Sequence, residues 1–262
     1  MSDLLDLKGR VALVTGAGQG VGRQIALDLA GHGAGAVIVN DFFKARAESV
    51  SEEITALGGR GIPVSFDVTD HFAVLEGVGA AVAQAGPVDI LVNNAGNAGP
   101  EHTIFDNTPF WETGPDEWAP WIGSNFYGVL NCTRAVTGEM VARGYGRIVT
   151  IISDAGRVGE PHLVVYSGAK AGAAGFMRGL AKSVGRYGVT ANCIALSAMR
   201  TPASESALED PEMVRKMLRS YVIKRLGEPS DASGLALFLA SDAAEWITGQ
   251  TYPVNGGYSV AL

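Results

Sequence analysis

The sequence predicts an α/β fold in which one parallel sheet of about seven strands lies between two layers of helices. Short runs of β-branched and apolar residues recur along the chain with little alternation, as in strands buried on both faces. Between them lie stretches with apolar residues at three- and four-residue spacing, which is typical of helices. This regular exchange of strand and helix indicates a doubly wound, Rossmann-like, three-layer architecture.

The expected strands are residues 11–15, 36–40, 62–66, 90–93, 148–152 and 190–196, with a short seventh at 251–254. The expected helices are residues 21–31, 45–57, 72–85, 118–143 and 167–187. Because no linker, repeat or low-complexity tract interrupts this alternation, we expect residues 1–262 to form a single domain. Ligands of such sheets bind at the carboxyl ends of the strands, where functional residues are therefore expected.

Composition narrows the function classes. Hydrophobic residues make up 47% and charged residues 18% of the 262 residues, which favours a large buried core over disorder. The net charge of −7 disfavours partners such as nucleic acid and anionic membranes. No signal peptide or membrane span is recognisable, and the two cysteines, Cys132 and Cys193, have no metal-ligand spacing. We expect a cytoplasmic protein without a metal site.

Glycine is in excess, with 35 residues, and several of them gather after the first expected strand. Residues 15–22 read Thr-Gly-Ala-Gly-Gln-Gly-Val-Gly and open the first expected helix. Bare backbone and the free N–H groups of a helix start attract a phosphate. The residues expected to hold a dinucleotide here are Gly16, Gln19, Gly20, Val21 and Gly22. A plain tight turn would use the same glycines.

Asp41 follows the second expected strand, 19 residues after Gly22. An acid at this place accepts a hydrogen bond from the ribose 2′-hydroxyl of NAD and repels the 2′-phosphate of NADP. Neither Gln19 nor Phe42 offers a positive charge, and we expect the nearest basic residues, Lys44 and Arg46, to be solvated. NAD is therefore the expected cofactor, with NADP less favoured.

Tyr166 and Lys170 stand four residues apart, hence on one face of a helix. An alcohol that gives up a hydride must also give up a proton, which a phenol can carry if its pKa falls. Because tyrosine titrates near 10, we expect Lys170 and an oxidised nicotinamide to lower the pKa of Tyr166. The pair predicts hydride transfer between a secondary alcohol and a ketone, with Tyr166 as general acid and base.

The motif at 15–22, Asn-Asn-Ala-Gly at 93–96 and Tyr-x-x-x-Lys at 166–170 together resemble the short-chain dehydrogenase/reductase family. The resemblance runs from about residue 8 to residue 258. Ser153 and Asn125 precede Tyr166 by 13 and 41 residues, as in the catalytic Asn–Ser–Tyr–Lys set of that family. It implies that Ser153 and Tyr166 hold the substrate oxygen, that Tyr166 and Lys170 also touch the cofactor, and that Asn125 holds a water linking Lys170 to solvent.

Further roles come only from the resemblance. It implies an adenine contact at Asp67 and Val68, a ribose floor at Asn94, Ala95 and Gly96, and a carboxamide or pyrophosphate contact at Thr201. It also implies a homotetramer built through the helices near residues 118–143 and 167–187. The chain departs from the family at Leu196-Ser197, where Pro-Gly is usual, so the path of the backbone toward Thr201 is open.

The substrate is suggested by two stretches. Residues 197–225 are the expected substrate lid, and residues 200–225 carry six basic and four acidic residues in an otherwise acidic chain. This charge indicates either an anionic substrate, such as a coenzyme A thioester meeting Arg215, Lys216 or Arg219, or a solvated helix face. A second stretch is aromatic and predicts either the wall of a bulky apolar site or internal and interface packing: Phe105, Phe110, Trp111, Trp118 and Trp121.

The sequence thus predicts an NAD-dependent oxidoreductase for a secondary alcohol or ketone of bulky alicyclic, steroid-derived or acyl-CoA type. Residues 153–159 resemble the segment of family members that act on such compounds. The alternatives are a reductase of 3-oxoacyl thioesters, a non-catalytic NAD-binding sensor, and a lyase or epimerase that uses bound NAD.

Overall fold

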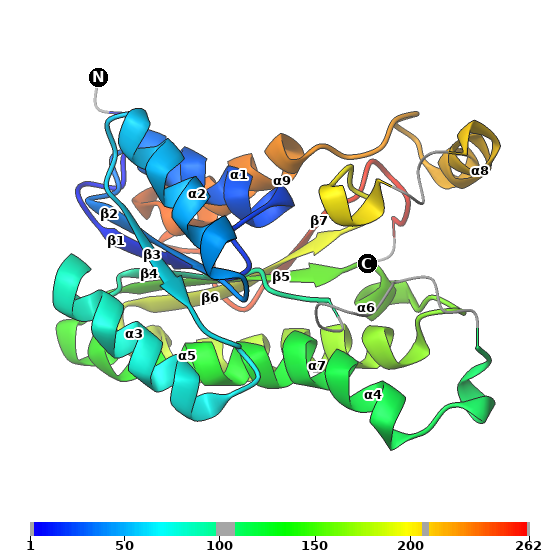
Figure 1. Ribbon diagram of the computed structural model, residues 1–262, viewed down its shortest axis with the longest axis horizontal. Helices are drawn as coiled ribbons and strands as arrows, with labels where there is room; N and C mark the ends of the chain where they lie inside the picture. Colours follow the sequence, from blue (N-terminus) through cyan, green and yellow to red (C-terminus); the bar gives the residue numbers. More distant parts are fainter. Residues whose placement is uncertain (1–2, 98–107, 206–209, 261–262) are drawn as a thin grey trace.

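Seven parallel strands form the central sheet, in the order β3-β2-β1-β4-β5-β6-β7 (Figure 1). The computed structural model describes residues 3–97, 108–205 and 210–260 of the chain. The strands are β1 Val11–Val14, β2 Ala36–Asp41, β3 Gly61–Ser65, β4 Ile90–Asn93, β5 Gly146–Ser153, β6 Val189–Leu196 and β7 Thr251–Val254. The predicted doubly wound fold is confirmed, and its switch point lies between β1 and β4, where such folds bind ligands.

Helices cover both faces of the sheet. The described helices are α1 Gly20–Gly31, α2 Lys44–Ala56, α3 His71–Ala85, α4 Pro115–Ile122, α5 Gly128–Arg143, α6 Ala155–Val158, α7 Val164–Val184, α8 Pro211–Met217 and α9 Pro229–Ala240. In Figure 1, α1, α2 and α9 lie above the sheet, and α3, α5 and α7 lie below it. Each layer closes one hydrophobic core against one face of the sheet.

Strand β1 shows why these runs are apolar throughout. Its side chains alternate between the two cores. Val11 and Leu13 belong to the core between the sheet and α3, α5 and α7, while Ala12 and Val14 belong to the core between the sheet and α1, α2 and α9. A strand covered on both faces needs apolar residues at every position. The edge strand β3 is more exposed and contains Pro63, which an edge tolerates because proline cannot donate a ladder hydrogen bond.

The helix expected over residues 118–143 is instead three consecutive pieces. Helix α4 begins at Pro115 and ends at Ile122, a π turn follows at Gly123–Tyr127, and α5 continues from Gly128. Single π turns inside helices are frequent at functional sites, and this one contains Asn125. Helix α7 begins at Val164, three residues before the expected start, and therefore carries Tyr166 in its first turn.

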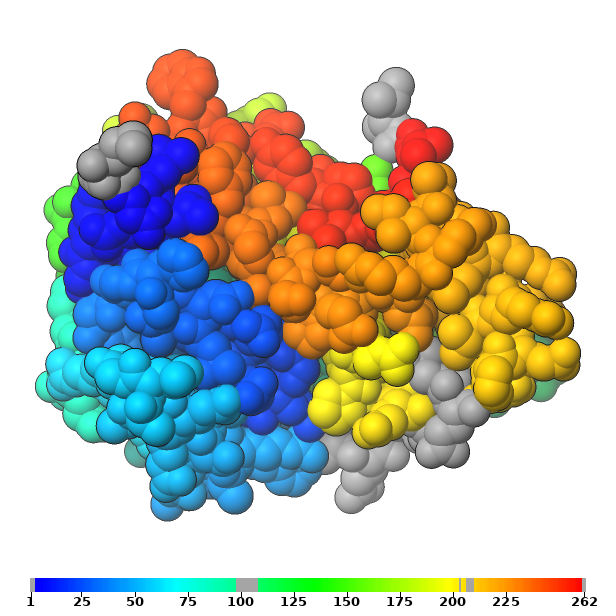
Figure 2. Space-filling model, turned by 90° about the horizontal axis from the view of Figure 1, so that it is seen from above, coloured from blue at the N-terminus to red at the C-terminus, as the bar shows by residue number. Residues whose placement is uncertain are grey.

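Between β6 and α9 the chain leaves the sheet, and the described residues of this stretch, 197–205 and 210–228, are called here the β6–α9 segment. Its return path pairs with its start, because Met199 and Gly227 form a parallel β-bridge. Figure 2 shows its gold part, which includes α8, protruding at one end of the molecule beside α9. The segment is attached to the end of the sheet where the strands finish, which is where the predicted site residues gather.

Candidate active site

The glycine loop joins β1 to α1 in a conformation that needs glycine. Gly20 has a φ of 57°, which side chains other than glycine rarely adopt. A Cβ atom at Gly22 would lie 2.3 Å from the carbonyl oxygen of Gly16 and 2.4 Å from Nδ2 of Asn94. Gln19 precedes the first turn of α1 with extended backbone, and the Val21 side chain is buried in the core, so only its backbone faces the loop.

Asn94 ties the loop to the end of β4. Its Nδ2 donates to the carbonyl oxygens of Thr15 at 3.0 Å and Gly16 at 2.9 Å. The Thr15 hydroxyl in turn accepts from the N–H groups of Asn94 at 3.0 Å and Ala95 at 3.1 Å. Thr15 is thus a structural member of the site that the sequence reasoning quoted without assigning, although it opens the glycine motif.

Asp41 ends β2 and is only 6% exposed. One carboxylate oxygen accepts from the N–H of Gly18 at 3.0 Å, and the other accepts from the N–H of Phe43 at 3.0 Å. The negative charge therefore lies against the glycine loop. Arg46 is also close, because its Cβ would lie 2.5 Å from a Cβ at Gly18, while its guanidinium stacks 4.5 Å from the centre of the exposed Phe43 ring.

Asp67 and Val68 follow β3, beside the end of β2. Asn40 donates to the carbonyl oxygen of Phe66 at 3.2 Å, which ties the two strand ends together. Asp67 accepts from the N–H of Thr69 at 2.8 Å, and Val68 is 8% exposed. Both residues therefore lie on the same side of the switch point as Asp41.

Thr201 lies across the glycine loop from these residues. A Cβ at Gly20 would meet its Cγ2 at 3.3 Å, so the β6–α9 segment starts directly over the loop despite Leu196-Ser197. A glycine loop at a helix start, a carboxylate at the end of β2 and Thr201 above the loop together fit a nicotinamide dinucleotide.

Ser153, Tyr166 and Lys170 converge at the end of β5. Ser153 lies close enough to Tyr166 for its hydroxyl to lower the pKa of the phenol, and Ser153 Oγ accepts from the N–H of Ala155 at 3.2 Å. Lys170 is 2% exposed, its Nζ donates to the carbonyl oxygen of Ile151 at 2.9 Å, and Nζ lies 5.7 Å from the centre of the Tyr166 ring. The predicted trio is therefore brought together from β5 and α7.

Asn125 completes the group from the π turn. Its side chain is fully buried, and Nδ2 donates to the carbonyl oxygens of Trp121 at 2.9 Å and Asn97 at 3.5 Å. Its Oδ1 has no hydrogen-bond partner among the described residues. A Cβ at Gly96 would lie 3.0 Å from this oxygen and 2.7 Å from Nζ of Lys170, so the two polar atoms flank Gly96.

The pKa of Tyr166 shifts in the opposite direction to the one expected from Lys170. Burial raises it above its usual value of 10, and the hydrogen bond from Ser153 only partly offsets that rise. Burial also lowers the pKa of Lys170 to about 8, because a buried ammonium loses hydration. The protein by itself therefore favours a neutral phenol, and a lower pKa for Tyr166 depends on the positive charge of an oxidised nicotinamide.

The aromatic stretch divides into two parts. Trp121 packs edge-on against Tyr166 with ring centres 5.5 Å apart, so one predicted aromatic residue does border the reacting group. Phe110 and Trp118 stack on each other with ring centres 5.4 Å apart, but Phe110 is 44% exposed and Trp111 is 81% exposed, so these rings lie at the surface. Phe105 lies outside the described residues.

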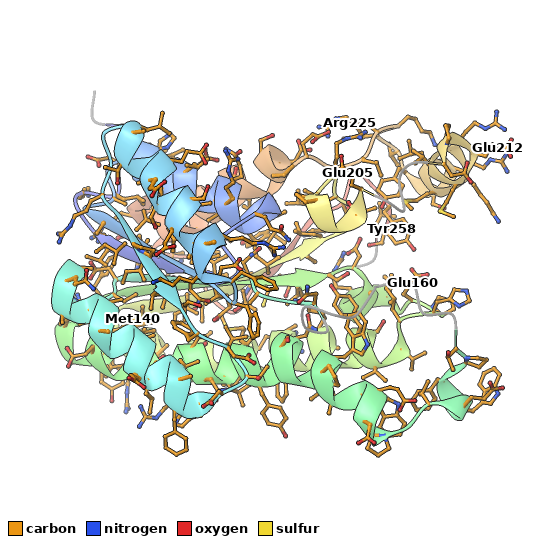
Figure 3. All side chains as sticks on the ribbon, in the orientation of Figure 1. Met140, Glu160, Glu205, Glu212, Arg225 and Tyr258 are labelled. Carbon is orange, nitrogen blue, oxygen red and sulfur yellow. The ribbon has the colours of Figure 1, made fainter. Side chains whose placement is uncertain are left out.

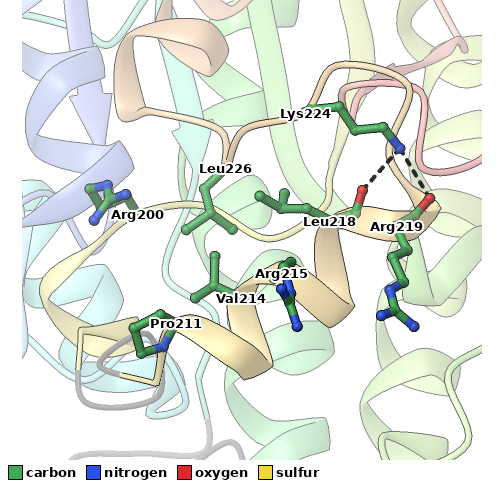
Figure 4. Close-up of a pocket in the computed structure, with 8 residues that line it drawn as sticks. All are labelled: Arg200, Pro211, Val214, Arg215, Leu218, Arg219, Lys224 and Leu226. Carbon is green, nitrogen blue, oxygen red and sulfur yellow. Dashed lines mark hydrogen bonds between the residues drawn. The ribbon is translucent and has the colours of Figure 1, made fainter.

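A basic pocket of about 560 Å³ opens in the β6–α9 segment (Figure 4). Its apolar lining is Pro211, Val214, Leu218 and Leu226, and its charged lining is Arg200, Arg215, Arg219 and Lys224. Lys224 donates to the carbonyl oxygens of Leu218 and Arg219, both at 3.2 Å. Of the three predicted anion contacts, Arg215 and Arg219 line the pocket and Lys216 does not.

Within residues 3–97, 108–205 and 210–260, no group of three or more His, Cys, Asp or Glu side chains is arranged to hold a metal ion. In the same part of the chain no helix has the length and apolar character needed to span a bilayer.

Comparison with known proteins identifies relatives along nearly the whole chain. The family model described as enoyl-(acyl carrier protein) reductase matches residues 16–259. The chain is 36% identical over 256 residues to 7α-hydroxysteroid dehydrogenase of Escherichia coli K12, covering 98% of this chain and 96% of that protein. It is also 36% identical over 246 residues to a 3-oxoacyl-(acyl-carrier-protein) reductase of Staphylococcus epidermidis, covering 94% and 97%.

Two solved structures superpose closely. A 7α-hydroxysteroid dehydrogenase complexed with NADH and 7-oxo glycochenodeoxycholic acid has a TM-score of 0.89 and 36% identity, with 98% of both chains covered. A gluconate 5-dehydrogenase from Burkholderia cenocepacia in complex with NADP and tartrate has a TM-score of 0.91 and 32% identity, with 99% of both chains covered. The fold, the matched family model and these relatives lead to one conclusion: the chain belongs to the short-chain dehydrogenase/reductase family of NAD(P)-dependent alcohol dehydrogenases and ketoreductases.

Proposed function

We propose that the protein interconverts a secondary alcohol and a ketone with NAD as the preferred cofactor, using Tyr166, Ser153, Lys170 and Asn125. The observation that carries this proposal is that Ser153, Tyr166 and the buried amine of Lys170 converge at the end of β5, with Lys170 Nζ 5.7 Å from the centre of the Tyr166 ring. Asp41 supports the preference for NAD, because its buried carboxylate would repel a 2′-phosphate.

In the oxidative direction, the bound nicotinamide supplies the hydride acceptor. The Ser153 hydroxyl holds the substrate oxygen beside Tyr166. Tyr166, in its phenolate form, takes the alcohol proton on Oη as the C–H hydride leaves. Lys170, whose pKa of about 8 lies near neutrality, can pass that proton onward. Asn125 Oδ1, buried near Lys170 Nζ across Gly96, would accept from a water that continues this path. In reduction the same groups return the proton.

The proposed substrate is a bulky alicyclic or steroid-derived hydroxy or keto compound, or an acyl-CoA derivative. Trp121 against Tyr166 supports an apolar ring at the reacting carbon. The basic pocket supports an anionic group on the substrate, because four cationic side chains line it, of which Arg200 and Arg215 also pair with Glu228 and Glu212. We propose that residues 197–225 are the part of the single domain that covers the substrate.

A reductase of 3-oxoacyl thioesters is the second candidate, since one relative of equal identity carries that name. The same four residues would serve it, and the basic pocket would meet a thioester carrier. The two candidates differ in the ketone that is reduced, so they separate in one substrate screen.

The proposal is tested by following NADH absorbance with steroid, alicyclic and acyl-CoA ketones, beside NADPH, in the wild-type protein and Tyr166→Phe. We expect turnover with NADH on at least one ketone and a loss of about 10²- to 10⁴-fold in the variant. The variant should bind NADH as tightly as the wild type. Full turnover by Tyr166→Phe would refute the mechanism, and NADH binding without any turnover would favour the sensor or a lyase or epimerase.

We also propose a homotetramer formed through the long helices. Tyr127 directly precedes α5 and Tyr187 lies in the short turn after α7; they are 56% and 37% exposed, which leaves apolar surface for a partner copy. Light scattering after size-exclusion chromatography decides this, and a monomer at micromolar concentration would contradict it.

A cytoplasmic location is proposed on the cysteines. Cys132 and Cys193 are both buried and unpaired, as in proteins of reducing compartments. Fractionation of cells that express the tagged protein would test this, and recovery in an exported fraction would oppose it.

A further inference from the structure

Asp154, the residue after Ser153, carries a carboxylate that is almost fully buried, with 1% of the residue exposed. Its Oδ1 accepts from Nη1 of Arg157 at 2.6 Å. Its Oδ2 accepts from Nδ2 of Asn255 at 2.6 Å and from Oγ of Ser259 at 3.0 Å. Burying a carboxylate is costly unless charge and hydrogen bonds compensate, and here both oxygens are satisfied by residues from two distant parts of the chain.

Residues 255–259 follow β7 and are called here the C-terminal turn. Asn255 closes this turn from inside: its Nδ2 also donates to the carbonyl oxygen of Ser259 at 2.9 Å, and its Oδ1 accepts from the N–H of Gly257 at 3.0 Å. Because Asn255 and Ser259 are the two ends of the turn, Asp154 holds the turn as a unit against the end of β5.

The C-terminal turn in turn holds the β6–α9 segment. The carbonyl oxygen of Gly256 accepts from the N–H groups of Val222 at 3.0 Å and Ile223 at 2.8 Å. The rings of Tyr258 and Tyr221 pack with centres 5.2 Å apart, and the Tyr258 hydroxyl donates to Glu160 at 3.1 Å. Figure 3 shows Tyr258 and Glu160 facing each other at the end of the sheet that carries this segment.

Tyr221 links the C-terminal turn to the start of the β6–α9 segment. It is 4% exposed, and its hydroxyl oxygen accepts from the N–H of Ala198 at 3.0 Å. Ala198 directly follows Leu196-Ser197, the place where this chain departs from the usual Pro-Gly, and it precedes Thr201 by three residues. A chain of contacts therefore runs from Asp154 through the C-terminal turn and Tyr221 to the backbone that starts the β6–α9 segment.

We propose that Asp154 is a positioning residue that sets the position of the β6–α9 segment at the carboxyl end of the sheet, acting through the C-terminal turn and Tyr221. It does not touch the substrate. The carboxylate suits this role because all three of its side-chain partners are donors, and an amide at this place would turn an N–H toward one of them. Its catalytic consequence rests on the proposed function, whereas its effect on the segment does not.

The structural part is tested by hydrogen exchange of the Ala198, Val222 and Ile223 amides in the wild type and in Asp154→Asn. We expect exchange to accelerate by about tenfold or more, since these three N–H groups bond within the proposed connection. The matched control is Asp242→Asn, which removes another carboxylate bonded to Lys8, Arg10 and Arg147. The control should leave these three amides at the wild-type rate, and the wild-type rate in Asp154→Asn would overturn the proposal.

The catalytic part is tested on the ketone found by the NADH screen. Asp154→Asn should raise KM for the ketone by about tenfold with a change in kcat below about threefold, because substrate placement is disturbed rather than proton transfer. NADH affinity should change less than about twofold. A fall in kcat with KM unchanged would overturn the positioning role. If no ketone is turned over, the proposed function fails while hydrogen exchange still decides the structural claim.

Two further variants keep the test decisive if Asp154→Asn does not fold. Ser259→Ala removes only one bond to the carboxylate and should accelerate exchange of the same amides by about threefold. In the double variant Asp154→Asn with Asn255→Asp, donor and acceptor change places across the 2.6 Å contact. Amide exchange should be slower and KM closer to the wild-type value in this double variant than in Asn255→Asp alone. Wild-type exchange in Ser259→Ala, or no recovery in the double variant, would contradict the proposal.

Discussion

Lys170 and Asn125 approach Gly96 from the same side, so that a Cβ on this glycine would lie 2.7 Å from Lys170 Nζ and 3.0 Å from Asn125 Oδ1. Both side chains are buried, at 2% and 0% exposure. The absence of a side chain at Gly96 therefore leaves room for the amine and the amide oxygen of the proposed proton path. This adds to the expected role of Gly96 beside a ribose.

Gly96→Ala should lower kcat by about tenfold to a hundredfold, because the new methyl group must push the Lys170 ammonium away from its place near Tyr166. The fold should persist, since the displaced atom is the end of a flexible side chain. Steady-state kinetics and thermal unfolding measure both effects. Gly138→Ala, at an exposed glycine of α5 whose Cβ would meet nothing within 4 Å, is the matched control and should stabilise the protein by about 1 kcal/mol without loss of activity.

Asp41→Ala should shift the cofactor preference from NAD toward NADP. Loss of a charged hydrogen-bond acceptor costs about 1.5–3 kcal/mol, so kcat/KM with NAD should fall by about tenfold to a hundredfold. With the negative charge gone, Arg46 beside Gly18 becomes available to a 2′-phosphate, and kcat/KM with NADP should rise. Adding Arg46→Ala should cancel that rise. Unchanged NAD kinetics in Asp41→Ala would remove Asp41 from the cofactor site.

The stability of the protein should rise with pH through the titration of Lys170. Burial lowers its pKa from 10.5 to about 8, so between these values the unfolded chain holds a proton that the folded chain has released. The contribution of Lys170 to the free energy of unfolding therefore increases as pH rises across this window. Below this window the folded and the unfolded chain both hold the proton on Lys170. Burial of the charged ammonium then lowers the free energy of unfolding by about 3 kcal/mol, from about 1.4 kcal/mol per pH unit.

Urea unfolding near pH 7.5 and near pH 10 measures this change. Lys170→Met should lose it, whereas Lys182→Met, at an exposed lysine of the same helix, should keep it. If the free energy of unfolding changes equally between the two pH values in the wild type and in Lys170→Met, the buried amine does not titrate in this window.

Charge reversal in the basic pocket should weaken the binding of anionic substrates and leave that of neutral substrates unchanged. Arg219→Glu should raise KM for an acyl-CoA ketone by about tenfold and leave KM for a neutral alicyclic ketone unchanged. Lys216→Glu makes the same charge change next to Arg215 but outside the pocket lining, so its effect should stay below about twofold. Kinetics at low salt compare the two. If both variants change KM equally, the effect comes from the general surface charge and not from a substrate contact in the pocket.

Much of the fold and part of the site could be read from local pattern. Strand β6 was expected at 190–196 and runs Val189–Leu196, because a strand buried on both faces leaves a continuous apolar run. The four-residue spacing of Tyr166 and Lys170 predicted a common helix face, which α7 provides. The break at Gly123–Tyr127 could not be read in this way, since the same residues fit an uninterrupted helix by spacing alone.

Electrostatics and long-range contacts were beyond local pattern. The direction of the Tyr166 pKa shift depends on burial by residues far away in sequence, and the spacing to Lys170 carries no information on that burial. Local pattern assigns no role to Asp154, because the residues that bond to its carboxylate, Asn255 and Ser259, lie about one hundred positions later in the chain. Lys216 was a reasonable candidate for an anion contact, but the pocket is lined by Arg215 of α8 and by Arg219 of the turn that follows this helix.

The sequence by itself therefore determined the parallel sheet, the glycine loop with Asp41, and the common helix face of Tyr166 and Lys170, because periodicity and spacing are properties of neighbouring residues. Ser153 and Asn125 joined this set only through the resemblance to the family. Only the tertiary structure decided how Asn125 and Lys170 meet at Gly96, which cations line the pocket, and how Asp154 reaches the β6–α9 segment. Those outcomes depend on burial and on contacts between distant residues, and both arise when the chain packs around its two cores.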